Sequence, residues 1–295
     1  MEYFLHILIM ISIYVILGLS LNLIVGYTGL ISLNHAAFYG IGAYVIALMA
    51  LNLHTPFLVN VICAVFISGF IGAIIGFPAL RIREDYFAVY TFAFQIIIFS
   101  VLNNWVSLTG GPIGLSGIPQ PSIFTWRISS HLGFAFLSFL FLAPLLWIIY
   151  RIVNSPFGRV LKTIREDEVL AEASGKKVNS YKILVLIIGA GTAALAGTIY
   201  AYYISFIDPT SFTITESIFI ISIVIIGGAG SLWGPIIGAV ALVVLPELIR
   251  FTGLPSSVSS NIRQILFGGL LVVFIMRRPQ GLLGEYFFHD NSLQK

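Results

Sequence analysis

Long uncharged stretches of apolar residues fill most of this chain. No Asp, Glu, Lys or Arg occurs between Tyr3 and Leu80, and this stretch alone could supply three membrane crossings at about 20 residues each. A soluble core with that composition would present no polar face to water. The pattern therefore predicts a polytopic membrane protein of the all-α class, a bundle of transmembrane helices.

Charged residues and Gly/Pro clusters divide the apolar sequence into about nine predicted crossings, within a range of eight to ten. We expect residues 1–295 to form a single transmembrane domain, with the first two crossings hinged at Gly26–Gly29. The stretch 215–251 is interrupted by glycines and Pro235, so a broken or re-entrant pair is the alternative there to two full crossings. The predicted crossings cover residues 3–25, 30–51, 57–80, 86–104, 132–150, 183–206, 215–232, 234–251 and 262–277.

Two segments are too polar to cross a membrane. Residues 105–131 are rich in Gly, Pro and Ser, which predicts an extramembrane loop. Residues 151–182 hold seven of the chain's 15 basic residues and four of its 12 acidic residues. Because Lys and Arg collect on cytoplasmic loops, we place 151–182 in the cytoplasm, and 105–131 and the N-terminus outside.

The charged segment carries the marks of one or two short amphipathic helices. Ser155 followed by Pro156 is typical of a helix start, and Gly175 lies where a helix would be capped at its end. Leu161, Ile164 and Ala171 fall near one face at helical spacing. A connector needs only about 2–8 residues. From these properties alone, a docking surface and a solvated loop are equally favoured.

The charged segment also resembles a known family. Residues 155–168 read SPFGRVLKTIREDE and are followed by AEASG at 171–175. This sequence is similar to the cytoplasmic loop of ATP-binding cassette (ABC) permeases for branched-chain amino acids of the LivM type. The resemblance covers roughly residues 18–284. The other matching segments are LNLIVGYTGL at 21–30, HAAFYGIGAY at 35–44, DYFA at 85–88, NNW at 103–105, LTGGP at 108–112, GGAGS at 227–231, GP at 234–235 and RPQGL at 278–282.

The resemblance implies a multi-pass permease subunit of an importer in the cytoplasmic (inner) membrane of a bacterium or archaeon. Its expected partners are a homologous second permease (LivH-like), two cytoplasmic ATPase subunits, an external or periplasmic solute-binding protein and the lipid bilayer. ATP and Mg²⁺ would be bound by the ATPases, so this chain is expected to hold no cofactor and to catalyse no reaction. The candidate ATPase-coupling residues are Arg159, Arg165, Glu166, Asp167, Glu168, Ala171, Glu172 and Gly175.

Polar side chains inside the apolar segments are candidates for a translocation path, because such groups are costly in lipid and face other helices or a pathway. A hydrogen bond between helices is the alternative for each, and Glu216 could also lie at a membrane edge. Few of the ionisable residues fall within the predicted crossings, which fits a permease that passes its substrate without holding it tightly. The candidates are Asn22, Asn34, His35, Gln95, Asn103, Asn104 and Glu216.

Other functional classes find little support. The basic segment is mixed with acids and has no interleaved aromatics, so no nucleic-acid binding is expected. No phosphate-binding loop motif occurs, and the five histidines show no metal-ligand spacing. Gly114–Gly117 matches a serine protease motif but falls in the broken loop. The alternatives that remain are the same machinery carrying urea, short amides or another small solute, and a stand-alone secondary transporter, which would need paired buried charges.

Overall fold

The computed structural model describes residues 1–79, 84–123, 126–250, 268–269, 272–274, 276–277 and 280–284. Within these residues six helices are long and apolar enough to cross a membrane. This confirms the predicted bundle of membrane helices. The six are α1 (Glu2–Thr28), α2 (His35–Leu48) with its π-helical extension η1 (Met49–Leu53), α3 (Phe57–Ala79), α4 (Glu84–Asn104), α6 (His131–Asn154) and α9 (Val178–Ile204).

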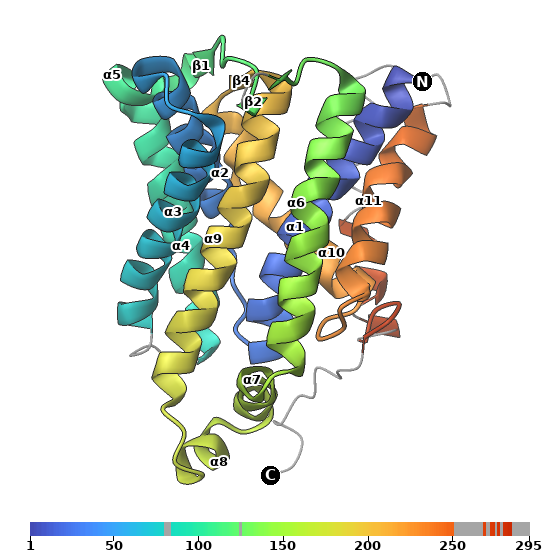
Figure 1. Ribbon diagram of the computed structural model, residues 1–295. Helices are drawn as coiled ribbons and strands as arrows, with labels where there is room; N and C mark the ends of the chain where they lie inside the picture. Colours follow the sequence, from blue (N-terminus) through green and yellow to red (C-terminus); the bar gives the residue numbers. More distant parts are fainter. Residues whose placement is uncertain are drawn as a thin grey trace.

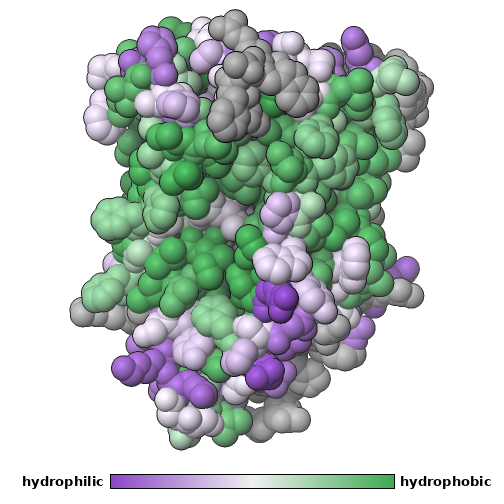
Figure 2. All heavy atoms as spheres, in the orientation of Figure 1, coloured by the Kyte–Doolittle hydropathy of each residue, from purple (hydrophilic) through white to green (hydrophobic). Residues whose placement is uncertain are grey.

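The long helices stand side by side in one bundle, in which α9 packs against α1, α2 and α3 (Figure 1). The N-terminus and the short strands lie at one end of the bundle. The other end carries α7 (Pro156–Glu166) and α8 (Glu168–Ala173), and we call it the charged end. Figure 2 shows a hydrophobic band around the middle of the visible face and hydrophilic residues gathered at the two ends. The predicted placement of 105–131 and 151–182 at opposite ends agrees with this arrangement.

Residues 105–123 and 126–130 form short helices and strands at the end of the bundle opposite α7 and α8 (Figure 1). Strand β1 (Leu115–Ser116) pairs antiparallel with β4 (Phe206–Ile207), so the loop is fastened to the segment that follows α9. Strands β2 (Ser122–Ile123) and β3 (Trp126–Arg127) form a second antiparallel pair. The remaining short elements are α5 (Val106–Thr109), η2 (Gly111–Ile113) and η3 (Pro209–Phe212).

Two shorter apolar helices follow η3. Helix α10 (Ile214–Gly227) has 14 residues and α11 (Gly234–Arg250) has 17. A crossing needs about 17–25 residues, so α10 is too short and α11 lies at the lower limit. These lengths favour the broken pair over two full crossings. The predicted ninth crossing, 262–277, lies largely outside the described residues.

Small residues allow α2 and α9 to approach closely. A Cβ atom at Gly42 would lie 2.4 Å from the carbonyl oxygen of Ala194, and one at Gly197 would lie 2.1 Å from that of Tyr39. Backbone atoms cannot rotate away from such contacts. Glycine is therefore required at both positions for this packing, which is the role that small residues play between helices in lipid.

Candidate functional site

Helix α7 begins and packs as its sequence predicts. Ser155 caps the helix, and its Oγ accepts a hydrogen bond of 3.4 Å from the backbone N–H of Gly158, while Pro156 occupies the first turn. Leu161 is buried in the core of the bundle, and Ile164 is buried against Ala171 and Val178. A Cβ atom at Gly158 would lie 2.1 Å from the carbonyl oxygen of Val153, so only glycine lets the chain turn so tightly from α6 into α7.

Asp167 divides the charged segment into two helices. Its backbone is extended, and its Oδ1 accepts a 3.0 Å hydrogen bond from the N–H of Leu170, which caps α8. Gly175 follows α8 with a φ of +75°, and its N–H donates to the carbonyl oxygen of Glu172 at 2.8 Å. This left-handed residue confirms the predicted glycine cap. The segment is a helix, a sharp break and a second helix, which then leads into α9.

Three of the eight predicted coupling residues are held against the bundle. Arg165 is 7% exposed at its side chain, and its Nη1 donates to the carbonyl oxygen of Gly26 at 2.5 Å. Glu168 forms an ion pair of 2.6 Å with the buried Nζ of Lys182. Ala171 is fully buried. These contacts anchor α7 to α1 and α8 to α9.

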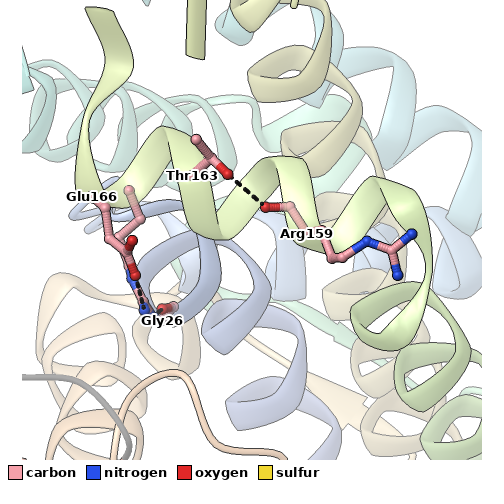
Figure 3. A network of polar contacts seen from close by, with 5 residues as sticks. Gly26, Arg159, Thr163 and Glu166 are labelled. Atoms are coloured by element: carbon pink, nitrogen blue, oxygen red, sulfur yellow. Dashed lines mark hydrogen bonds and ion pairs between the residues drawn. The ribbon is translucent and has the colours of Figure 1, made fainter. Parts of the chain in front are cut away.

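The other predicted coupling residues are exposed at the charged end. Figure 3 shows the side chain of Arg159 pointing away from the end of α7 that adjoins Gly26. Two exposed apolar residues of α8 lie beside them and were not predicted, because an apolar pair in a short helix is normally expected to be buried. Val169 is 75% exposed and Leu170 is 57% exposed. The exposed members of the predicted set are Arg159, Glu166, Asp167, Glu172 and Gly175.

A second polar cluster surrounds the start of α2, which begins inside the bundle after the non-helical residues 29–34. The backbone N–H of Ala36 donates to Ser217 Oγ at 3.0 Å, and that of Ala37 donates to Gln95 Oε1 at 2.7 Å. The Gln95 amide in turn donates to the carbonyl oxygen of Phe212 at 2.7 Å. Side chains from α4 and α10 thus satisfy helix N–H groups that water cannot reach.

Asn34 and His35 belong to the same cluster. The Nε2 of His35 lies 2.5 Å from Ser20 Oγ, and the Oδ1 of Asn34 accepts from Ser32 Oγ at 2.6 Å. Both residues are fully buried. Of the seven predicted path residues, the structure therefore brings Asn34, His35 and Gln95 together. Ser217, which completes the cluster, was missed because a lone serine in an apolar helix gives no distinctive signal.

The remaining predicted path residues lie elsewhere. Asn22 binds the turn between α10 and α11, where its Nδ2 donates to the carbonyl oxygen of Ser231 at 2.8 Å. Glu216 lies in the first turn of α10 and forms a hydrogen bond with Tyr14. Asn103 and Asn104 lie at the end of α4, where Asn104 is exposed and bonds locally to the carbonyl oxygen of Ser100 at 2.8 Å.

The apolar band, the irregular backbone satisfied inside the bundle and the charged helices at one end together define a helical integral membrane protein. Comparison with known families gives the particular assignment. The chain belongs to the family of permease components of branched-chain amino acid transport systems, whose model matches residues 3–275. It is thus a multi-pass protein of the bacterial or archaeal cytoplasmic membrane.

Curated relatives bear out this assignment. The chain is 37% identical to the high-affinity branched-chain amino acid transport permease LivM of Salmonella typhimurium, over 93% of this chain and 68% of the relative. It is 27% identical to a probable LivM of Methanocaldococcus jannaschii, over 95% and 92% of the two chains. It is 26% identical to LivH of Escherichia coli, over 93% and 92%. No solved structure matches the chain.

Proposed function

We propose that this chain is the membrane-spanning subunit of an ATP-driven importer for branched-chain amino acids, and that α7 and α8 are the surface on which a cytoplasmic ATPase subunit docks. The ATPases bind ATP and Mg²⁺, and this chain contributes half of the translocation pathway. The family provides the transport role. The proposal for ATPase docking rests on the geometry of the charged end.

The exposed apolar pair on α8 carries this proposal. Val169 and Leu170 are adjacent, and both are more than half exposed. Helix α8, which carries them, lies at the tip of the charged end (Figure 1). Apolar contacts surrounded by polar groups are the usual anatomy of a protein interface. The ion pair of the half-buried Glu168 with the buried Lys182 holds α8 in place, so Val169 and Leu170 lie on a helix that is fixed to the bundle.

Replacing the pair tests the docking surface. We expect the Val169→Ser, Leu170→Ser double variant to insert normally and to lose most of the ATPase that co-purifies with the wild-type chain in mild detergent. Burial of two such side chains contributes about 2–4 kcal/mol, after allowance for their partial exposure. Ile113→Ser is the matched control, because Ile113 is 83% exposed at the opposite end of the bundle. Equal ATPase recovery with both variants would contradict the docking assignment.

The buried cluster at the start of α2 supports a path that runs beside this helix end. Non-helical backbone is tolerated at membrane depth only where it is buried in protein or lines a cavity. Asn34, His35 and Gln95 are the residues that we assign to the path. Similarity to both LivM and LivH supports pairing with a homologous permease. A solute-binding protein would deliver the substrate to the end opposite α7 and α8.

Uptake by reconstituted complexes separates the remaining alternatives. Vesicles containing the complex and its binding protein should accumulate labelled leucine, isoleucine or valine only when ATP is present on the ATPase side. Accumulation of urea or a short amide in preference would keep the machinery and change the cargo. Accumulation by the purified chain alone, driven by an ion gradient, would replace the proposal with a secondary transporter.

A further inference from the structure

The last turns of α1 form a junction between α7 and the rest of the bundle. Arg165 at the end of α7 donates to the carbonyl oxygen of Gly26. Gly29, which ends α1 with a φ of +82°, packs so closely on α7 that a Cβ atom there would lie 3.0 Å from Arg165 Cγ. Nearby, the Nζ of Lys162 lies 5.7 Å from the ring centre of Tyr27. Helix α7 is therefore attached to α1 at several points.

The same turns of α1 hold the turn between α10 and α11, residues 228–233. Asn22 binds it with both ends of its amide, donating to the carbonyl oxygen of Ser231 at 2.8 Å and accepting from the N–H of Gly230 at 2.9 Å. A Cβ atom at Gly26 would lie 2.4 Å from the nitrogen of Gly230. Asn22 and Gly26 are one helical turn apart, so they lie on the same face of α1.

The chain near its C-terminus also joins this turn. The N–H groups of Leu282 and Leu283 donate to the carbonyl oxygens of Ile226 and Gly227 at 2.9 and 3.0 Å. The end of α10 is thus bound on one side by α1 and on another by residues 280–284. Asn22 and Arg165 are the only side chains that form hydrogen bonds in these contacts among the described residues.

We propose that Asn22 and Arg165 are the two positioning residues of one mechanical joint, through which a displacement of α7 reaches the turn between α10 and α11. This inference rests on the proposed docking of an ATPase on α7 and α8. The polar groups of the joint are buried. If α7 or the turn between α10 and α11 slid along α1, buried donors and acceptors would lose their partners. Helix α7, the end of α1 and the turn between α10 and α11 therefore move together. Asn22 accordingly belongs to the coupling machinery and not to the surface that contacts substrate.

The joint is tested in proteoliposomes that contain the whole complex, by measuring the ATP hydrolysed per molecule of leucine imported. We expect Asn22→Ala and Arg165→Ala each to raise this ratio by about fivefold or more, the lower end of typical coupling between sites. Because both residues act through one element, the double variant should raise it no further than the larger single change. Arg165→Lys, which retains a donor for the Gly26 carbonyl, should restore part of the coupling.

Asn60→Ala is the matched control for lost stability. Asn60 is a fully buried asparagine near the other end of the bundle, and its Nδ2 donates to the Tyr202 hydroxyl at 2.9 Å. This variant should lower the melting temperature as Asn22→Ala does and leave the ratio unchanged. The proposed joint is wrong if Asn22→Ala leaves the ratio of ATP hydrolysed to leucine imported unchanged. It is also wrong if Asn60→Ala raises this ratio equally, or if the effects of Asn22→Ala and Arg165→Ala add in the double variant. Failure of the wild-type chain to recover any ATPase would instead overturn the proposed function.

Discussion

Substituting alanine for Gly42 should separate two helices that now touch through their backbones. The added Cβ would lie 2.4 Å from the carbonyl oxygen of Ala194 and 2.5 Å from its Cα, whereas ordinary contacts begin at 3.4 Å. Neither neighbour can rotate away, so α2 and α9 must move apart by about 1 Å. Overpacking of this kind costs roughly 1–3 kcal/mol.

The displacement should also reach the polar cluster at the start of α2. The hydrogen bonds from Ala36 and Ala37 measure 3.0 and 2.7 Å, so a shift of α2 by about 1 Å relative to Ser217 and Gln95 would strain or break both. We therefore expect leucine uptake by the complex to fall together with stability. Gly69→Ala is the control, because a Cβ atom at Gly69 would meet its nearest neighbour at an ordinary 3.4 Å.

The assay is the loss of the monodisperse peak of the purified chain after heating in detergent. A loss of 1–3 kcal/mol corresponds to a fall of about 2–10 °C in the melting temperature of a chain this size. Gly69→Ala should melt within a degree or so of the wild type. If Gly42→Ala melts and transports like Gly69→Ala, the close approach of α2 and α9 is wrong.

Three further predictions concern single contacts. Lys182→Met leaves the Glu168 carboxylate without its partner and should destabilise the chain by about 1–3 kcal/mol, and adding Glu168→Gln should recover part of the loss in thermal unfolding. Gln95→Leu removes the acceptor for the Ala37 N–H and the donor to the Phe212 carbonyl, so we expect a similar loss and reduced uptake, whereas Asn104→Leu, at an exposed position of the same helix, should change little. Gly175→Val should cost about 1–2 kcal/mol from its left-handed backbone, since a Cβ atom there meets nothing within 4 Å, and Gly175→Asn much less. Equal melting temperatures within any of these pairs would refute the corresponding contact.

Local features of this fold could be predicted from sequence because their causes are local. The Ser155 cap, Pro156 in the first turn and the left-handed Gly175 each depend on neighbouring backbone atoms only. The same is true of the long apolar helices, whose length alone indicates a membrane crossing. The family assignment followed from motifs spread along the chain, which do not require knowledge of how the helices pack.

Which charged side chains of residues 151–182 bind the bundle and which are exposed could not be predicted in this way. Arg165 and Arg159 are both basic residues of α7, yet Arg165 is bound to Gly26, which is 139 residues away along the chain, and Arg159 is exposed. Likewise, Gln95 and Ser217 meet across 122 residues. Which polar residue turns inward depends on the position of distant helices, and periodicity within one segment carries no information about that position.

The hydrogen bonds of Asn22 to the turn between α10 and α11 have a consequence for how the protein is made. Its partner Ser231 follows 209 residues later, so at about 5–20 residues per second the ribosome needs roughly 10–40 s to supply it after α1 has emerged. During that interval the amide of Asn22 has no native partner. An unsatisfied amide is costly in hydrocarbon. The final seating of α1 in the bilayer therefore waits for α10 and the turn that follows it, and one of the first helices to be synthesised is among the last to be fixed.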